Sequence, residues 1–152
     1  MGDLLKMVKM FFTKPSNIKE VDTVKMKHIP PKGFKYLMWC GHCLYTKDKC
    51  STLNPVDKNH EMIHLRQAQD KGSWAIYYLS YLWEWIKGWP YKDSYYTIKY
   101  EVESYAKEYD LDYLNRRKKG DVRLFKLYNR HGFYKSCKSR ISYKQKLREL
   151  YK

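Results

Sequence analysis

The chain has 152 residues and a formal net charge of +15, and aromatic residues make up 17% of it. This length suits one domain with one hydrophobic core rather than several domains, and the 16 Tyr and 5 Trp are expected to fill much of that core. No secretory signal is evident, because Lys6 and Lys9 interrupt the first apolar run. Together with the four Cys residues, this predicts a cytoplasmic protein in which disulfides are not assumed.

The first elements predicted in chain order are a linker and a β-hairpin. We expect residues 1–27 to be frayed and Ile29-Pro30-Pro31 to form an extended linker. Residues 34–39 and 43–46 are two short β-prone runs on either side of Gly41. This arrangement is typical of two antiparallel strands joined by a tight turn.

The turn of this hairpin carries a motif with a competing function. Trp39-Cys40-Gly41-His42-Cys43 matches the active-site motif of protein disulfide isomerases, whose chemistry needs a thiol of lowered pKa. That chemistry also requires a long helix starting at Cys40, whereas residues 44–46 are β-prone, so we expect plain hairpin thiols. A structural zinc knuckle stays open, with ligands drawn from Cys40, Cys43, Cys50 and either His42 or Cys137.

A helix with a metal-binding motif is predicted over residues 55–71. Asn54 is a favourable N-cap, Pro occupies the first helical position, and no Gly or further Pro interrupts the run. His60 and His64 are four residues apart, so their imidazoles lie on one face of the helix and can bind one metal ion. Glu61 can then act as the general base toward a water molecule on that ion. The alternative is a structural pair of histidines on an ordinary helix.

An aromatic helix is predicted over residues 74–87, ending at Gly88-Trp89-Pro90. Its apolar run is shorter than the ~20 residues needed to cross a bilayer and contains Glu84, so we expect no transmembrane helix. The interpretation that we favour is a buried central helix of a small α-rich domain. The alternative is a helix that lies in a membrane interface, where Trp and Tyr are common.

A third metal ligand is expected on a later helix, because two histidines leave a catalytic zinc one protein ligand short. The helix predicted over residues 98–108 carries Glu101, Glu103 and Ser104. Here the sequence resembles the gluzincin class of zinc metallopeptidases, in which a Glu-x-x-Ser/Ala element provides this ligand. The resemblance is closest to small bacterial members of the class and covers residues 34–118. It implies that Glu101 is the ligand; Glu103 is the rival, but it lies about 200° around the helix, so only one of the two can face the metal.

The chain departs from the larger gluzincins around this element. Those proteins have Asn before the ligand Glu and an Asp after the Ser, and this Asp orients a ligand His. Tyr100 and Tyr105 occupy these places here, so the residues that orient the histidines stay unassigned. Gln67 extends the first motif to His-Glu-x-x-His-x-x-Gln, as in the small bacterial members.

The positive charge is concentrated at the end of the chain, where residues 115–152 hold 14 Lys or Arg against two acidic residues. A helix is expected over residues 111–119, stopped by Gly120, and one or two basic helices follow. We expect a metallopeptidase-like domain over residues 28–118 and a basic, helical segment over 119–152 packed on it. That segment could bind an anionic surface, either a membrane or a nucleic acid. The apolar side chains expected to hold it in place are Leu124, Phe125, Leu127, Phe133, Leu147 and Leu150.

The sequence as a whole predicts an α+β fold, dominated by helices, with a small N-terminal β-hairpin or sheet beside the metal-binding helix. The predicted function is that of a zinc-dependent hydrolase resembling a small metallopeptidase and acting on a peptide or protein substrate. In it His60, His64 and Glu101 hold zinc, and Glu61 takes the proton from the zinc-bound water as it attacks the peptide bond. The alternatives are a basic binding module with a structural His pair, or a thiol–disulfide exchanger at the Cys-x-x-Cys motif. The oxyanion donor is left open among Tyr96, Tyr105 and His131.

Overall fold

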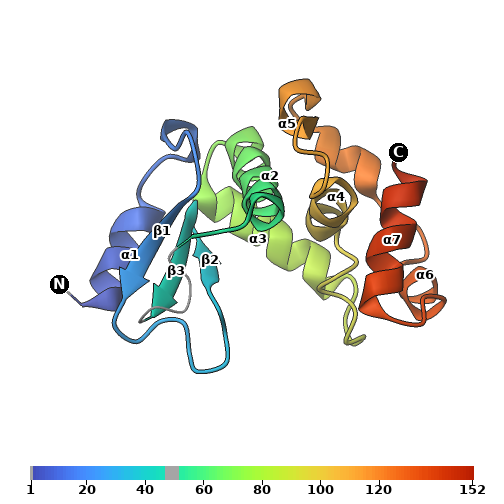
Figure 1. Ribbon diagram of the computed structural model, residues 1–152, viewed down its shortest axis with the longest axis horizontal. Helices are drawn as coiled ribbons and strands as arrows, with labels where there is room; N and C mark the ends of the chain where they lie inside the picture. The colour runs from blue at the N-terminus through green and yellow to red at the C-terminus, as the bar shows by residue number, and fades with distance from the viewer. Residues whose placement is uncertain (1, 47–51) are drawn as a thin grey trace.

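The computed structural model describes residues 2–46 and 52–152 and has the predicted α+β fold, dominated by helices. Figure 1 shows a small sheet and helix α1 on one side of the molecule and α4, α6 and α7 on the other, with α2 and α3 between them. The elements, in chain order, are α1 (Asp3–Phe11), the 3-10 helix η1 (Pro15–Asn17), β1 (Asp22–Met26), β2 (Leu37–Trp39), β3 (His42–Thr46), α2 (Pro55–Lys71), α3 (Trp74–Ile86), α4 (Lys99–Lys107), α5 (Tyr113–Arg116), the 3-10 helix η2 (Asp121–Phe125), α6 (Arg130–Lys135) and α7 (Arg140–Leu150).

The predicted β-hairpin is confirmed. β2 pairs antiparallel with β3, with Trp39 opposite His42. The two turn residues, Cys40 and Gly41, both have positive φ angles, 48° and 81°, as a two-residue hairpin turn requires. The first strand begins at Leu37, three residues later than predicted, and no helix begins at Cys40.

The N-terminal segment forms α1, η1 and β1, so the prediction that it is frayed up to residue 27 is wrong. β1 runs parallel to β3, which makes β3 the central strand of a sheet with the order β1-β3-β2. The carboxylate of Asp3 ties the start of α1 to the end of β1, because it accepts hydrogen bonds from the backbone N–H groups of Lys27 at 3.1 Å and His28 at 2.7 Å. These partners are distant in sequence, and a local pattern does not reveal them.

Helix α2 has the bounds predicted from the sequence and lies between the two halves of the core (Figure 1). Asn54 caps it by accepting a hydrogen bond from the N–H of Asp57 at 2.8 Å, and Gly72 ends it with a left-handed φ of 72°. One hydrophobic cluster joins α2 to the sheet and α3 through Leu65, and a second joins α2 to α4 and α7 through Ile63. The helix is therefore held from both sides.

The C-terminal basic segment packs on α4 through α7, where Tyr143 and Leu147 are fully buried. The helix expected over residues 111–119 is a single turn, α5. Of the six apolar side chains expected to hold the segment, Phe125, Leu127 and Leu147 are buried and Phe133 is partly buried, whereas Leu124 and Leu150 are exposed.

Helix α3 is buried on one face only. The prediction of a buried central helix is therefore correct for its inner face and wrong for its outer face. Trp74, Tyr77 and Glu84 are buried, whereas Leu79 and Trp83 are 67% and 60% exposed. Within residues 2–46 and 52–152, none of the helices combines the length and apolar character that a membrane-crossing segment needs.

Candidate metal centre

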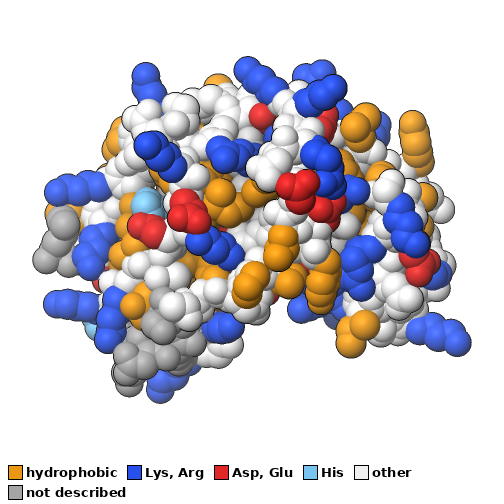
Figure 2. Space-filling model, turned by 45° about the horizontal axis from the view of Figure 1, so that its top comes forward, with side chains coloured by type: hydrophobic (Ala, Val, Ile, Leu, Met, Phe, Trp, Pro, Cys, Tyr) orange, Lys and Arg blue, Asp and Glu red, His pale blue; other side chains and the backbone are white. Residues whose placement is uncertain are grey.

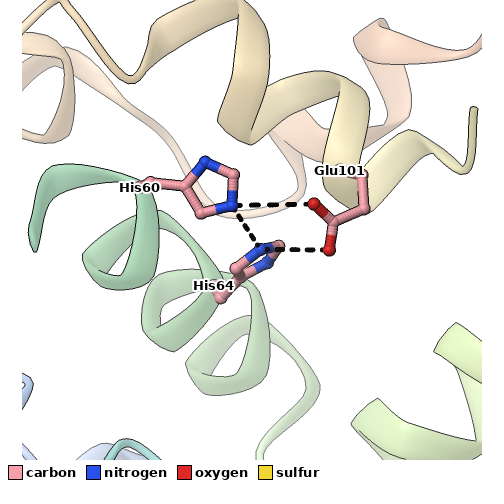
Figure 3. Close-up of side chains that lie close together, drawn as sticks. All are labelled: His60, His64 and Glu101. Carbon is pink, nitrogen blue, oxygen red and sulfur yellow. Dashed lines mark hydrogen bonds and ion pairs between the residues drawn. The ribbon is translucent and has the colours of Figure 1, made fainter. Parts of the chain in front are cut away.

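His60 and His64 face each other across one turn of α2, with their Nε2 atoms 3.2 Å apart. Glu101 of α4 completes the group: its Oε1 lies 3.3 Å from Nε2 of His64, and its Oε2 lies 3.6 Å from Nε2 of His60 (Figure 3). Ligand atoms of the three residues all lie within 4.8 Å of one another, and the described residues contain no second group of this kind. The structure thus brings together the three side chains that the sequence predicts as metal ligands.

Glu103, the rival ligand, points into a different part of the core. Its carboxylate is fully buried and accepts hydrogen bonds from the hydroxyl of Tyr113 at 2.9 Å and from Nε of Arg117 at 2.5 Å. Arg117 also pairs with Asp70 of α2, at 2.9 Å. Glu103 therefore belongs to a buried ion-pair network. It is not part of the candidate metal group, the name used below for His60, His64 and Glu101.

The orientation of the His64 ring is set by Gln67, which lies one turn further along α2. The amide nitrogen of Gln67 donates to the carbonyl of Tyr100 and to a carboxylate oxygen of Glu103, both at 2.9 Å. The amide oxygen of Gln67 is therefore the atom that faces Nδ1 of His64, at 2.9 Å. Because an amide oxygen only accepts, Nδ1 carries the proton, and Nε2 presents its lone pair to the centre of the group.

Glu108, just after the end of α4, orients the ring of His60 in the same way. Its Oε2 lies 2.9 Å from Nδ1 of His60, so that nitrogen is the donor and Nε2 points inward. Lys144 of α7 contacts the same carboxylate at 3.3 Å. Glu108 is the orienting acid that the sequence left unassigned. It comes seven residues after Glu101, about two helical turns, and this spacing is the signal that could have found it.

Asn59 joins the two helices that carry the ligands. Its side-chain amide nitrogen donates to three backbone carbonyls at the end of α4, those of Lys107 at 3.1 Å, Glu108 at 2.9 Å and Asp110 at 3.1 Å. The last carbonyls of a helix lack partners within the helix. A side chain of α2 therefore caps the C-terminus of α4.

The buried polar atoms of this group fit a cation. Two Nε2 lone pairs at 3.2 Å cannot hydrogen-bond to each other unless one ring takes up a further proton. Oε2 of Glu61 and Oε2 of Glu101 are both buried without a hydrogen-bond partner, which is costly for a carboxylate. Burial lowers the pKa of His60, but the carboxylates of Glu101 and Glu108 outweigh it and raise this pKa to about 10. The site therefore attracts positive charge, and two imidazoles with one carboxylate are a ligand set that catalytic zinc uses.

Glu61 lies beside the metal group on the wall of a cavity of about 530 Å³. Its Oε1 accepts a hydrogen bond from the hydroxyl of Tyr36 at 3.2 Å. Burial raises the pKa of Glu61, and the neighbouring His64 and His60 partly oppose that shift. A carboxylate with a raised pKa and one free oxygen is suited to accept a proton from a water molecule in the cavity.

Only one of the three predicted oxyanion donors lies at this cavity. Tyr105 is part of its lining, whereas Tyr96 and His131 are not. The structure also shows a tyrosine of the cavity lining that contacts a predicted metal ligand. The hydroxyl of Tyr81, on α3, donates to Oε1 of Glu101 at 2.6 Å. Sequence reasoning missed Tyr81 because an aromatic helix offers many rings and no spacing rule that selects one.

The cysteine motif does not have the geometry of a disulfide-exchange site. Cys40 and Cys43 are both fully buried in the hairpin. Burial raises the pKa of the Cys40 thiol to about 12, so the thiolate is scarce at neutral pH. Cys137 lies in the hydrophobic cluster of α4 and α7, whereas Cys40 and Cys43 lie in that of the sheet, so the structure does not bring these three together. Cys50, the remaining predicted knuckle ligand, lies outside the described residues.

Comparison with known proteins gives no relative: no family model, no curated protein and no solved structure matches this chain. The resemblance to gluzincins therefore stays a prediction. The site itself supplies two inward-facing imidazoles, a buried carboxylate and, on the wall of the adjacent cavity, the carboxylate of Glu61.

Proposed function

We propose that this chain is a zinc-dependent hydrolase of the metallopeptidase type. The observation that carries the proposal is that His60 and His64 turn their Nε2 atoms toward each other and toward Glu101, each ring being held by an outer partner. Zinc favours neutral imidazoles and carboxylates, and a catalytic zinc site leaves one position open. An ion held by these residues would supply Lewis acidity toward a peptide carbonyl and a water molecule.

Glu61 is the proton acceptor in this proposal. Tyr36 holds one of its carboxylate oxygens, and the other has no partner and is free to take a proton from the attacking water. Tyr105 lines the same cavity, and its hydroxyl can donate to the oxygen that becomes negative as the carbonyl is attacked.

An extended peptide is the substrate that suits the cavity. In the sheet order β1-β3-β2, the outer side of β2 is unpaired within the described part of the chain. Leu37 and Met38 of β2 line the cavity together with Glu61. A peptide that adds a strand to this edge would pass beside the metal group. We place the activity in the cytoplasm, where free thiols such as those of Cys40 and Cys137 persist.

Metal analysis of the purified protein and two variants tests the proposal. The wild type should carry zinc, and His64→Ala should lose both zinc and peptide hydrolysis because a ligand is removed. Glu61→Gln should keep zinc but lose hydrolysis by at least the ~10²–10⁴-fold that general acid–base catalysis contributes. His131→Ala, a histidine away from the cavity, is the matched control and should behave like the wild type. Zinc retained in full by His64→Ala would refute the site.

A further inference from the structure

The outer face of α3 is an apolar surface that the fold leaves uncovered. It consists of Ile76, Leu79, Leu82, Trp83 and Ile86, all of them exposed. These residues recur at intervals of mostly three or four positions, so they lie on one side of the helix and form a stripe along it. Contiguous exposed apolar side chains of this kind mark interaction surfaces more often than isolated ones do.

The inner face of the same helix keeps this stripe turned outward. The hydroxyl of Tyr78 accepts a hydrogen bond from the backbone N–H of Cys40 at 2.8 Å, and the hydroxyl of Tyr81 donates to Glu101 at 2.6 Å. These contacts fasten α3 to the hairpin and to α4. The helix therefore cannot roll its outer face into the core without breaking them.

The charges around α3 favour an anionic partner. Glu84 is the only acidic residue of the helix, and it is buried in contact with three cations, Lys87, Lys99 and Arg130. Three cations on one carboxylate leave a surplus of positive charge. Lys87 is partly exposed, and its ammonium lies 5.7 Å from the ring centroid of Trp83, so part of that surplus borders the stripe.

We propose that the outer face of α3 docks on the surface of a membrane that contains anionic lipids. Trp and aliphatic side chains are those that a helix buries at the headgroup boundary when it lies flat on a bilayer, and Lys87 would meet the acidic headgroups. Figure 2 shows Lys and Arg side chains spread widely over the face it displays, with Asp and Glu in a few small groups. The net charge of +15 on the whole chain adds long-range attraction toward an anionic surface.

Two other occupants fit less well. A second copy of this chain also carries a net charge of +15, and the two would repel each other. A nucleic acid could be attracted by the same charge, but the aliphatic side chains of Ile76, Leu79 and Ile86 offer nothing that binds a phosphate.

Co-sedimentation of the full chain with lipid vesicles tests the proposal. At about 0.1 M salt the protein should sediment with mixed phosphatidylcholine–phosphatidylserine vesicles and much less with phosphatidylcholine alone. The double variant Leu79→Ser/Trp83→Ser should lower the partition coefficient on the order of tenfold or more, because two apolar side chains no longer leave water. Lys87→Gln should lower it about fivefold, and only on the anionic vesicles.

The matched control is Leu124→Ser/Ile141→Ser, which removes two apolar side chains that are at least as exposed, from η2 and α7, and should leave partition unchanged. Circular dichroism should show the same helix content in all of these proteins. A wild type that does not sediment with the anionic vesicles would overturn the proposal, as would equal partition of Leu79→Ser/Trp83→Ser. Concentration-dependent dimers that this variant abolishes, without lipid binding, would assign the face to a second copy instead.

Discussion

Gln67 donates a hydrogen bond from its amide nitrogen to Glu103 at 2.9 Å, and this contact decides which end of the Gln67 amide faces His64. Arg117 in turn holds Glu103 at 2.5 Å. A chain of polar contacts thus runs from the segment after α5 to the metal group, although Arg117 and His64 are far apart in sequence. The tautomer of a proposed metal ligand is therefore fixed by residues outside the proposed ligand set.

The first prediction concerns this contact. Gln67→Met keeps the length and the apolar packing of the side chain but removes the nearest acceptor for Nδ1 of His64, at 2.9 Å, and leaves only the hydroxyls of Tyr77 at 3.3 Å and Ser104 at 3.5 Å. We expect zinc affinity to fall about 10–100-fold, as for the loss of other partners that orient a ligand histidine. Competition with a chromophoric zinc chelator measures this. Gln145→Met, on the exposed side of α7, is the control, and equal affinity of the two variants would contradict the role assigned to Gln67.

The second prediction concerns His60. Glu108→Leu removes the carboxylate that accepts from its Nδ1, so zinc affinity should again fall about 10–100-fold. Glu108→Gln should lower zinc affinity much less, since an amide oxygen still accepts that hydrogen bond. The same chelator competition ranks the two, with Glu149→Leu as a control at an exposed site. Similar losses in both Glu108 variants would mean that its negative charge matters and not its hydrogen bond.

The third prediction separates two neighbouring arginines. The side chain of Arg117 is 4% exposed and pairs with Glu103 and Asp70, so Arg117→Met removes the cation that balances these two carboxylates, of which that of Glu103 is fully buried. The free energy of unfolding should fall by about 3–5 kcal/mol. Arg116 also pairs with two acids, but its side chain is 58% exposed. Arg116→Met should therefore lower the free energy of unfolding by less than about 1 kcal/mol. Urea unfolding followed by circular dichroism measures both, and equal losses would refute the distinction.

The fourth prediction is a pH dependence of stability. Burial raises the pKa of Glu84, but Lys87, Lys99 and Arg130 outweigh it and lower this pKa from its ordinary 4.5 to about 2. A carboxyl group with a lowered pKa in the folded state stabilises that state fully above its unfolded pKa and progressively less as the pH falls. The wild type should therefore be more stable than Glu84→Gln by about 3 kcal/mol near neutral pH.

The advantage over Glu84→Gln should shrink as the pH falls below about 5 and be almost gone near pH 2. Urea titrations of both proteins at a series of pH values measure the gap. A gap that stays constant from neutral to acidic pH would show that these cations do not hold the carboxylate in its charged form.

Elements whose ends are set by neighbouring residues are the ones that the sequence predicts well. The bounds of α2 are confirmed because Asn54 and Gly72 act within a few residues of the helix. The hairpin is confirmed for the same reason, since Cys40 and Gly41 make its turn. α1 and β1 were not predicted, because the contacts that hold them join residues distant in sequence. The carboxylate of Asp3 accepts hydrogen bonds from backbone N–H groups more than twenty residues later.

The residues of the candidate site also differ in how far the sequence predicts them. His60 and His64 follow from a spacing on one helix, and the structure places Glu101 beside them as the resemblance implied. Glu108 is not assigned by the resemblance, because the sequence places Tyr105 where a larger gluzincin has its orienting Asp. Its spacing of two helical turns from Glu101 is the only signal in the sequence, and the packing of α4 on α2 shows that this acid reaches the ring of His60.

The side chain of Asn59 has a mechanical consequence for the two helices that it joins. It holds three carbonyls at the end of α4 from the position just before His60, so it resists sliding of one helix along the other. A slip of one helical turn, about 5.4 Å, would carry Glu101 past both imidazoles. A single amide thus sets the longitudinal alignment of α2 and α4, and the three predicted ligands meet at the same height before any ion arrives.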